Sequence, residues 1–535
     1  MTNIEQNTHK TLTRATVTIA LFSLLSKLIG LLRDRIFASS FGAGDTLDIY
    51  YAAFRVPDFI FNMLILGAFA AAFLPVFTAT LNQDRARAFD LAATVLNATV
   101  IVMGVLCLIL VIFTPVLVKL IVPGFTTANQ AETASLTRIM LLSPLLFAIS
   151  SVFSSVLNSF KKFTLVAAMP IIYNLALILG VIVLYPAFGI NGLAYGVIIG
   201  AFLHAALQIF SVRKLGFRWK MLLNTKDPEA RKIWRLYVPR AFGAGGLNQI
   251  SFFISAVIGS TLAVGSIAIY NLANNLQIVP IGVFALAFAT VAFPHLAEAA
   301  AKNDQKTFKD VFNINLSQIL FLIIPFSVLM LILRAQIIRL VLGAGQFGWD
   351  DTVLTIQTFG FFALSLFAQS LIPLFSRAFF AMQNTVIPVV TGFIAAGANV
   401  VGAIFFTNFF GVAGLALAFT VAAIVNFVLL FILLEVKFGN IVDNELIFKL
   451  EKIILATLAA GILCYTALFA IEPFLDTRTF FGLLLQAVAA TLVGGLVYLG
   501  MGWILNIGES RHLISASRNW LNKIRNAFAK TSSGL

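Results

Sequence analysis

The sequence predicts an all-α polytopic membrane protein with about fourteen transmembrane helices, in two pseudo-symmetric six-helix lobes followed by two C-terminal helices. Three observations support this fold class. The 535 residues are 60% hydrophobic and only 11% charged, and the mean hydropathy is +0.98. Apolar segments of roughly 20 residues recur, the length that crosses a bilayer as a helix and excludes a β-barrel. Sequence motifs also recur at a nearly constant spacing, which indicates two copies of one unit.

Length and hydropathy define the predicted spans. They cover residues 13–38, 47–80, 88–117, 131–160, 163–186, 190–213, 229–258, 262–298, 305–333, 349–381, 384–409, 412–437, 449–471 and 477–505. The first apolar run leads into Lys27 and Arg33 instead of a small-residue cleavage site, so no cleavable signal peptide is predicted. Cys107 and Cys464 fall within spans, which favours packing roles over a disulfide framework or a cysteine metal site.

Lysine and arginine gather in every second loop. The basic loops include residues 85–87, 161–162, 213–232, 302–309 and 437–452. The positive-inside rule therefore predicts that both termini are cytoplasmic, with Arg339 and Arg478 as exceptions in the alternate loops. The net charge of +14 is explained by these loops, so no nucleic-acid partner is predicted.

Three motifs recur in the second half of the chain. The pairs are IYYAAFRV (49–56) with IYNLANNL (269–276), LVKLIVPGF (117–125) with IIRLVLGAGQF (337–347), and FGINGLAYG (188–196) with FGVAGLALA (410–418). Six predicted spans separate the copies, so both have the same orientation and a pseudo-two-fold axis along the membrane normal should relate them. The predicted organisation is an N-lobe (1–223), a C-lobe (229–440), spans 13 and 14 (449–505) and an interfacial basic amphipathic helix (510–530).

Charged residues inside the first two spans indicate a substrate-binding site. A charge at the bilayer centre costs at least ~2.5–3.5 kcal/mol, so such residues are functional candidates by default. Helical spacing brings some of them to one face, since Arg55 follows Asp48 by 7 residues. Cations in a polar cavity suit a phosphate, which arginine binds with a bidentate fork. The candidates here are Lys27, Arg33, Asp34, Asp48 and Arg55.

Two alternatives remain open for this set. Arg33 lies near the outer end of its span, where its side chain can extend to the lipid headgroups. For Asp34 and Asp48, the alternative is that they form ion pairs that merely neutralise the neighbouring cations. In the second copy, Asn271, Asn274 and Asn275 stand where the first has charge, and Arg240 lies in span seven. Amides in these positions bind sugar hydroxyls or simply join helices by hydrogen bonds.

Motifs of enzymes are absent from the sequence. It contains no GxxxxGK[ST] loop, no HExxH, no GxSxG and no Cys/His cluster. The outer loops are too short for a soluble catalytic domain. We therefore predict a transporter without catalytic residues, metal ion or cofactor, and a membrane glycosyl- or acyltransferase is the weaker alternative.

The first two spans resemble those of the MurJ (MviN) family of lipid II flippases, which belongs to the MATE-like multidrug/oligosaccharidyl-lipid/polysaccharide exporter superfamily. The matching segments are SKLIGLLRD (26–34), FGAGDTLDIYYAAFRVPDFIFNMLILGAFAAAFLPVF (41–77), IVPGF (121–125), SVLNSFKKFTLVAAMPIIYNLALI (155–178), YVPRAFGAGGLNQI (237–250), SRAFFAMQNTVIPV (376–389) and GVAGLALAFTVAAIVNFVLL (411–430). The resemblance covers residues 13–505 and implies fourteen helices. It also implies that Arg33 and Asp34 are the charged pair of the family's first span, and that Asp48 opens the second.

The chain departs from the family pattern at several charged positions. Lys27 stands where the family usually has arginine, so the charge is kept but the guanidinium fork is lost. An arginine pair and a glutamate of span two, and an arginine and a glutamate of span eight, are replaced by Phe61, Asn62, Leu66, Asn275 and Ile278. These differences concern the substrate and leave the expected fold unchanged.

The sequence thus predicts a flippase that moves lipid II from the cytoplasmic to the outer leaflet of the bacterial inner membrane by alternating access. Its partners would be a polyprenyl-pyrophosphate-linked glycan and membrane lipids, and the protein would be a monomer. The resemblance implies that the membrane potential drives transport, with a coupled cation left open. The alternatives are a flippase for another undecaprenyl-linked oligosaccharide, a MATE-like exporter, or a non-transporting scaffold for cell-wall enzymes.

Overall fold

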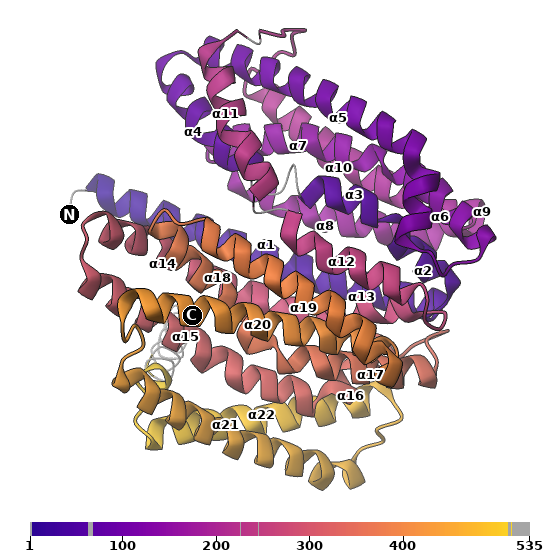
Figure 1. The fold of residues 1–535 in the computed structure, drawn as a ribbon, viewed down its shortest axis with the longest axis vertical. Coiled ribbons are helices and arrows are strands. Elements are labelled where there is room, and N and C mark those ends of the chain that lie inside the picture. Colours follow the sequence, from indigo (N-terminus) through magenta and orange to yellow (C-terminus); the bar gives the residue numbers. More distant parts are fainter. Residues whose placement is uncertain (1–2, 63–67, 225, 244–245, 512–514, 516–535) are drawn as a thin grey trace, which may run out of the picture. The chain divides into compact units, whose positions relative to one another are not determined.

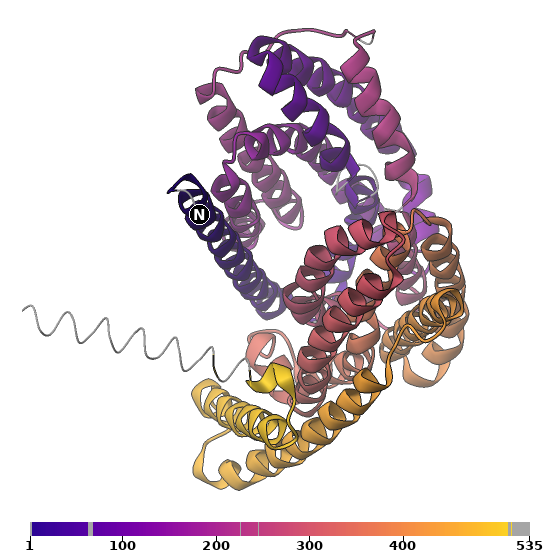
Figure 2. The same ribbon diagram turned by 90° about the vertical axis from the view of Figure 1, so that its left-hand side faces the viewer.

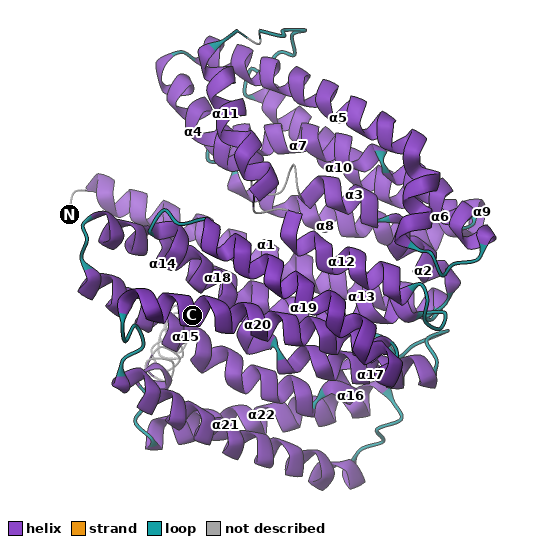
Figure 3. Cartoon of the chain, viewed as in Figure 1, coloured by secondary structure: helices purple, strands orange, loops and turns teal. Residues whose placement is uncertain are grey.

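The computed structural model describes residues 3–62, 68–224, 226–243, 246–511 and 515, with side chains from residue 21 onward except those of 68, 71 and 238–250. Within these ranges every regular element is a helix (Figure 1, Figure 3). The helices are α1 (Asn3–Phe41), α2 (Asp45–Ala53), α3 (Arg55–Ile60), α4 (Ala68–Gln83), α5 (Arg85–Ile121), α6 (Thr127–Met140), α7 (Leu142–Ser159), α8 (Phe163–Leu179), η2 (Gly180–Leu184), α9 (Tyr185–Phe188), α10 (Asn191–Lys214), α11 (Pro228–Gly243), α12 (Gly246–Gly259), α13 (Ser266–Pro280), η3 (Ile281–Ala285), α14 (Leu286–Ala301), α15 (Gln305–Ile332), α16 (Arg334–Val341), α17 (Trp349–Leu364), α18 (Leu366–Ala381), α19 (Val386–Phe410), α20 (Val412–Phe438), α21 (Asn444–Ile471), η4 (Glu472–Phe474) and α22 (Phe480–Ile504).

Many of these helices have the length and composition of membrane spans. Among the described residues, ten helical segments are long and apolar enough to cross a bilayer, or eleven if α17 and α18, which are bent by 41°, form one span. They coincide with eleven of the predicted spans, so the predicted all-helical, multi-span fold is confirmed. The other three predicted spans (13–38, 47–80 and 229–258) coincide with α1, α2–α4 and α11–α12 and contain most of the charged site candidates.

The second predicted span is broken by a proline. Pro57 lacks an N–H, and its ring clashes with the carbonyl four residues earlier, which belongs to Ala53. The helix α2 accordingly ends at Ala53, and α3 begins at Arg55. The break lies next to Arg55, so it contributes to the placement of that buried side chain.

The chain forms two compact units. The first contains Met1–Asn275, Val341–Thr358 and Ala396–Phe419. One of its core clusters includes Phe69, Phe73 and Phe77, which stack along one face of α4 because they are four residues apart. Phe153 of α7 and Phe217 are buried in the same cluster. Every charged or amide residue proposed for the site lies in this unit.

The second unit contains Leu276–Leu340, Phe359–Ala395 and Thr420–Leu535. Its core joins α15 and α18, where the rings of Phe312 and Phe375 meet edge to face with 5.1 Å between centroids. The helices α21 and α22 lie side by side as an antiparallel pair, drawn in yellow tones (Figure 1, Figure 2). A Cβ at Gly494 of α22 would be 3.1 Å from the Cβ of Cys464, so this cysteine serves close helix packing.

Left-handed residues recur along the chain at the spacing of the sequence motifs. Lys161 and Gln383 follow α7 and α18 with φ of 58° and 57°, and Gly189 and Gly411 precede α10 and α20 with φ of 59° and 53°. Each pair is separated by 222 residues. The lobes 1–223 and 229–440 stay a prediction, and most of the predicted basic helix 510–530 lies outside the described residues.

Candidate functional site

Arg33 and Asp34 form the centre of a polar cluster near the end of α1. Two nitrogens of Arg33, Nε and Nη2, donate to Asp34 Oδ1 over 3.0 and 2.6 Å, and its Nη1 donates to Asn174 Oδ1 of α8 over 3.0 Å. The other oxygen of Asp34 accepts from Asn275 Nδ2 of α13 over 3.1 Å. Asp34 is buried, while the Arg33 side chain is 23% exposed. A chain of hydrogen bonds therefore joins α8, α1 and α13.

Arg55 is buried at the start of α3. Its Nη2 donates to Asn271 Oδ1 of α13 over 2.8 Å, and its guanidinium carbon lies 5.5 Å from the centre of the Phe252 ring. Its Nε is buried and has no hydrogen-bond partner among the described residues. An unpaired buried donor is costly, and on a guanidinium it offers a fixed contact for an anion.

Asp48 holds the start of α13. Its two carboxylate oxygens accept from the backbone N–H groups of Gly265 and Ala268 over 2.7 and 2.8 Å, and its side chain is buried. The first N–H groups of a helix have no partner within the helix, and a carboxylate satisfies them particularly well. Asp48 thereby fixes the register of α13, which carries Asn271 and Asn275.

We expect Asp48→Ala to lower the free energy of unfolding by about 3 kcal/mol, because two buried N–H groups lose a charged acceptor. Thermal unfolding of the purified protein measures this change. Asp45→Ala is the matched control, since Asp45 lies on the same helix but is exposed and, among the described residues, accepts a side-chain hydrogen bond from Asn129. Equal stability losses for the two variants would contradict the capping role of Asp48.

The remaining candidates differ in how far the structure describes them. Lys27 is half-buried on α1, and Asn274 is buried on α13. The side chain of Arg240 lies outside the described residues. In the described chain, no group of three or more His, Cys, Asp or Glu side chains is arranged to hold a metal ion.

Several residues of the cluster were not predicted from the sequence. Asn174 was not among the predicted site residues, but it accepts a hydrogen bond from Arg33. Tyr51 lies within electrostatic range of Arg33, Asp34 and Arg55, and Tyr173 within range of Arg33. The adjacent tyrosines of IYYAAFRV were a usable signal, because a tyrosine next to an intramembrane arginine provides a hydroxyl for a polar site.

Two of the positions that depart from the family pattern have structural contacts in this chain. Phe61 packs against Phe147 with 5.0 Å between ring centroids, and Asn62 Nδ2 donates to the Asp58 carbonyl over 2.9 Å. Ile278 is exposed, and Leu66 falls in the undescribed segment 63–67. Arg33 and Arg55 are thus the arginines whose contacts the structure describes in this cluster.

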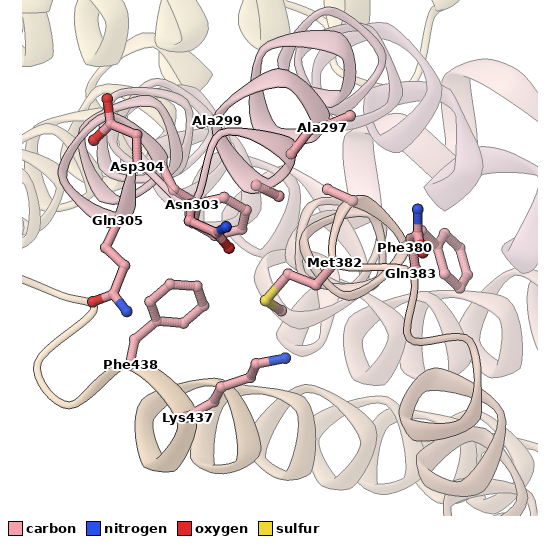
Figure 4. Close-up of a pocket in the computed structure, with 14 residues that line it drawn as sticks. Ala297, Ala299, Asn303, Asp304, Gln305, Phe380, Met382, Gln383, Lys437 and Phe438 are labelled. Carbon is pink, nitrogen blue, oxygen red and sulfur yellow. The ribbon is translucent and has the colours of Figure 1, made fainter.

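A separate cavity of about 650 Å³ lies where α14, α18 and α20 end. Figure 4 shows Lys437 and Phe438 on one side of this cavity and Met382 and Gln383 on another. Its lining includes none of the predicted site residues. It does not change the assignment of the candidate site.

An all-helical multi-span fold in which Arg33 pairs with Asp34, and in which Asp48 and Arg55 are buried, is typical of a membrane transporter, since such charges mark pathways for polar substrates. The sequence profile of one family, described as "Lipid II flippase MurJ", matches residues 37–484. The chain therefore belongs to the MurJ family of lipid II flippases.

Relatives in bacteria agree with this assignment. The chain is 28% identical over 442 residues to "Probable lipid II flippase MurJ" of Borreliella burgdorferi. The aligned region covers 82% of this chain and 87% of the relative. It is 27% identical over 512 residues to "Lipid II flippase MurJ" of Burkholderia cenocepacia, with coverage of 92% and 97%.

Solved structures share the fold. The structure titled "Lipid II flippase MurJ, inward closed conformation" superposes with a TM-score of 0.75 at 26% identity, covering 93% of this chain and all of the other. An inward-facing MATE family transporter of the MOP superfamily gives a TM-score of 0.65 at 14% identity, covering 79% and 98%. The second likeness concerns the fold alone.

Proposed function

We propose that the protein moves lipid II, or a closely similar polyprenyl-pyrophosphate-linked glycan, from the cytoplasmic to the outer leaflet of a bacterial inner membrane. The observation that carries the proposal is the presence of two arginines in the predicted first two spans, Arg55 buried and Arg33 half-buried. Arg55 keeps its Nε unpaired among the described residues, and Arg33 has used three of its five N–H groups. Both can therefore donate to phosphate oxygens.

The residues of the cluster suit the two parts of such a headgroup. Arg33 and Arg55 would bind the pyrophosphate through strong, directional guanidinium–phosphate hydrogen bonds, and Lys27 would add its ammonium charge. Asn271, Asn274, Asn275 and Arg240 would contact sugar hydroxyls, for which amides are suitable partners. Asp34 and Asp48 would act as positioning residues, the first on Arg33 and the second on α13.

Transport would proceed by alternating access, with the headgroup in the polar cluster and the polyprenyl tail in the bilayer. The charge bias of the loops supports cytoplasmic termini. A membrane potential would favour movement of the anionic headgroup toward the positive outer side, at about 2.3 kcal/mol per charge for 100 mV. A coupled cation is an additional source of energy that the family assignment leaves open.

The test is complementation. A bacterium depleted of its own lipid II flippase expresses this chain, and lipid II at the outer face is followed with a probe that cannot cross the membrane. We expect growth to recover and exposed lipid II to return. Membrane insertion of the chain must be established by fractionation. A failure to restore lipid II exposure then shows that the inserted protein does not transport lipid II.

A different lipid-linked oligosaccharide is the second candidate, favoured by Phe61 and Asn62 at the positions where the family usually has arginines. If the chain inserts correctly but does not restore lipid II exposure, the lipid II proposal is wrong. Transport of another undecaprenyl-linked glycan by the same cells would then identify the alternative.

A further inference from the structure

A second cavity of the second unit, about 430 Å³ in volume, carries two arginines that the proposed transport does not use. It is formed by the end of α15, α16, the end of α21 with η4, and α22. Arg334 and Arg339 of α16 line it, together with Gln336 and Glu472. By the charge bias of the loops this is the outer end of the spans, where cations are least expected.

The two arginines are arranged differently. Arg339 Nη2 donates to the carbonyl of Thr477 over 3.0 Å, which holds this side chain against the loop before α22. Arg334 is exposed and has no hydrogen bond or ion pair within the described chain, and it extends past Gly360. Glu472 is exposed and forms no ion pair with either arginine in the described residues. Neither arginine is therefore held in an ion pair within the described residues, although Glu472 lines the same cavity.

The same cavity has an unpaired acceptor and a lipid-facing side. Gln336 Oε1 is buried and has no hydrogen-bond partner among the described residues. Tyr465 and Phe469 of α21 line the cavity and remain 53% and 56% exposed. Aromatic residues of this kind occupy the boundary between lipid tails and headgroups. The cavity thus combines hydrogen-bond donors for an anion, an acceptor for a hydroxyl and an apolar rim.

We propose that this cavity binds the headgroup of a phosphatidylglycerol-type lipid from the outer leaflet. Arg334 and Arg339 donate to the phosphodiester, because guanidinium groups make strong charge-assisted bonds to phosphate. Gln336 accepts from a glycerol hydroxyl, and the acyl chains follow Tyr465 and Phe469. The site differs from the transport cluster in its residues and does not depend on the proposed function.

The test uses the full chain in nanodiscs that contain phosphatidylglycerol and phosphatidylcholine, followed by mass spectrometry of the intact protein with its retained lipids. We expect the native protein to retain phosphatidylglycerol preferentially. Arg334→Gln should weaken this retention about tenfold, the loss expected for charge-assisted contacts at a partly exposed site. Arg334 is the chosen position because its replacement leaves the bond from Arg339 to Thr477 intact.

Arg478→Gln is the matched control, since Arg478 is exposed on the same loop region and does not line the cavity. Equal retention by the native protein, the Arg334→Gln variant and the control overturns the proposal. A separate titration with inorganic phosphate distinguishes a free anion from a lipid. If phosphate alone displaces the retained phosphatidylglycerol, the site binds phosphate and the lipid assignment is wrong.

Discussion

Replacing Arg55 by alanine is expected to lower lipid II transport by about tenfold to hundredfold, the effect of losing one or two charge-assisted hydrogen bonds to a phosphate. The side chain is buried, and its Nε has no hydrogen-bond partner among the residues that the structure describes. Arg55→Lys should recover part of the activity, because it restores the charge without the fork. The measurement is the initial rate of lipid II exposure in the complementation strain.

Arg138→Ala is the control for a general effect of removing arginine, since Arg138 is exposed and, within the described part of the chain, donates a long hydrogen bond of 3.4 Å to the Val111 carbonyl. Protein level and thermal stability must be measured alongside, because Arg55→Ala also leaves Asn271 without its donor. Normal transport by a stable Arg55→Ala protein would exclude Arg55 from substrate binding.

The second large effect is expected on stability, from Gly265→Ala. Gly265 has φ of +88°, and a Cβ there would lie 2.1 Å from the carbonyl oxygen of Ala43. The obstacle is backbone, so it cannot move aside as a flexible side chain would. We expect a loss of about 2–4 kcal/mol from the left-handed conformation and the overlap together. Thermal unfolding in a constant lipid environment measures it.

Gly411→Ala separates the two causes. Gly411 also has a positive φ, of +53°, but a Cβ there would meet nothing within 4 Å. Its substitution should cost only about 1 kcal/mol, the strain of a non-glycine residue in this region. If both variants lose the same free energy of unfolding, the close approach of residue 265 to Ala43 does not explain why alanine is unfavourable at position 265.

The sequence identified residues of the polar site more successfully than it identified their hydrogen-bond partners. A charge within an apolar span is visible without a structure, so Arg33 and Arg55 could be identified from the sequence. A proline within a span indicates a helix break, and Pro57 lies at the break between α2 and α3. Helical spacing assigns residues to a face but does not say which helix covers that face. Asn174 could therefore not be matched with Arg33, 141 residues away.

Asp48 illustrates the same limit for function. An aspartate in a span beside cations suggests a role toward a ligand or an ion pair. Its hydrogen bonds instead go to backbone groups 217 and 220 residues further along the chain. A contact of this kind leaves no sequence signal, because any residue can supply an N–H group.

The hydrogen-bonded chain from Asn174 through Arg33 and Asp34 to Asn275 has a consequence for affinity. A phosphate that takes more than the two N–H groups that Arg33 has left competes with Asp34 and Asn174 for the same donors. Ligand binding and the attachment of α8 to α1 are then linked, and by reciprocity each weakens the other. The apparent dissociation constant is then the intrinsic one divided by the fraction of molecules in which this tether is open. A firmly closed resting state thus favours release of the headgroup over its retention.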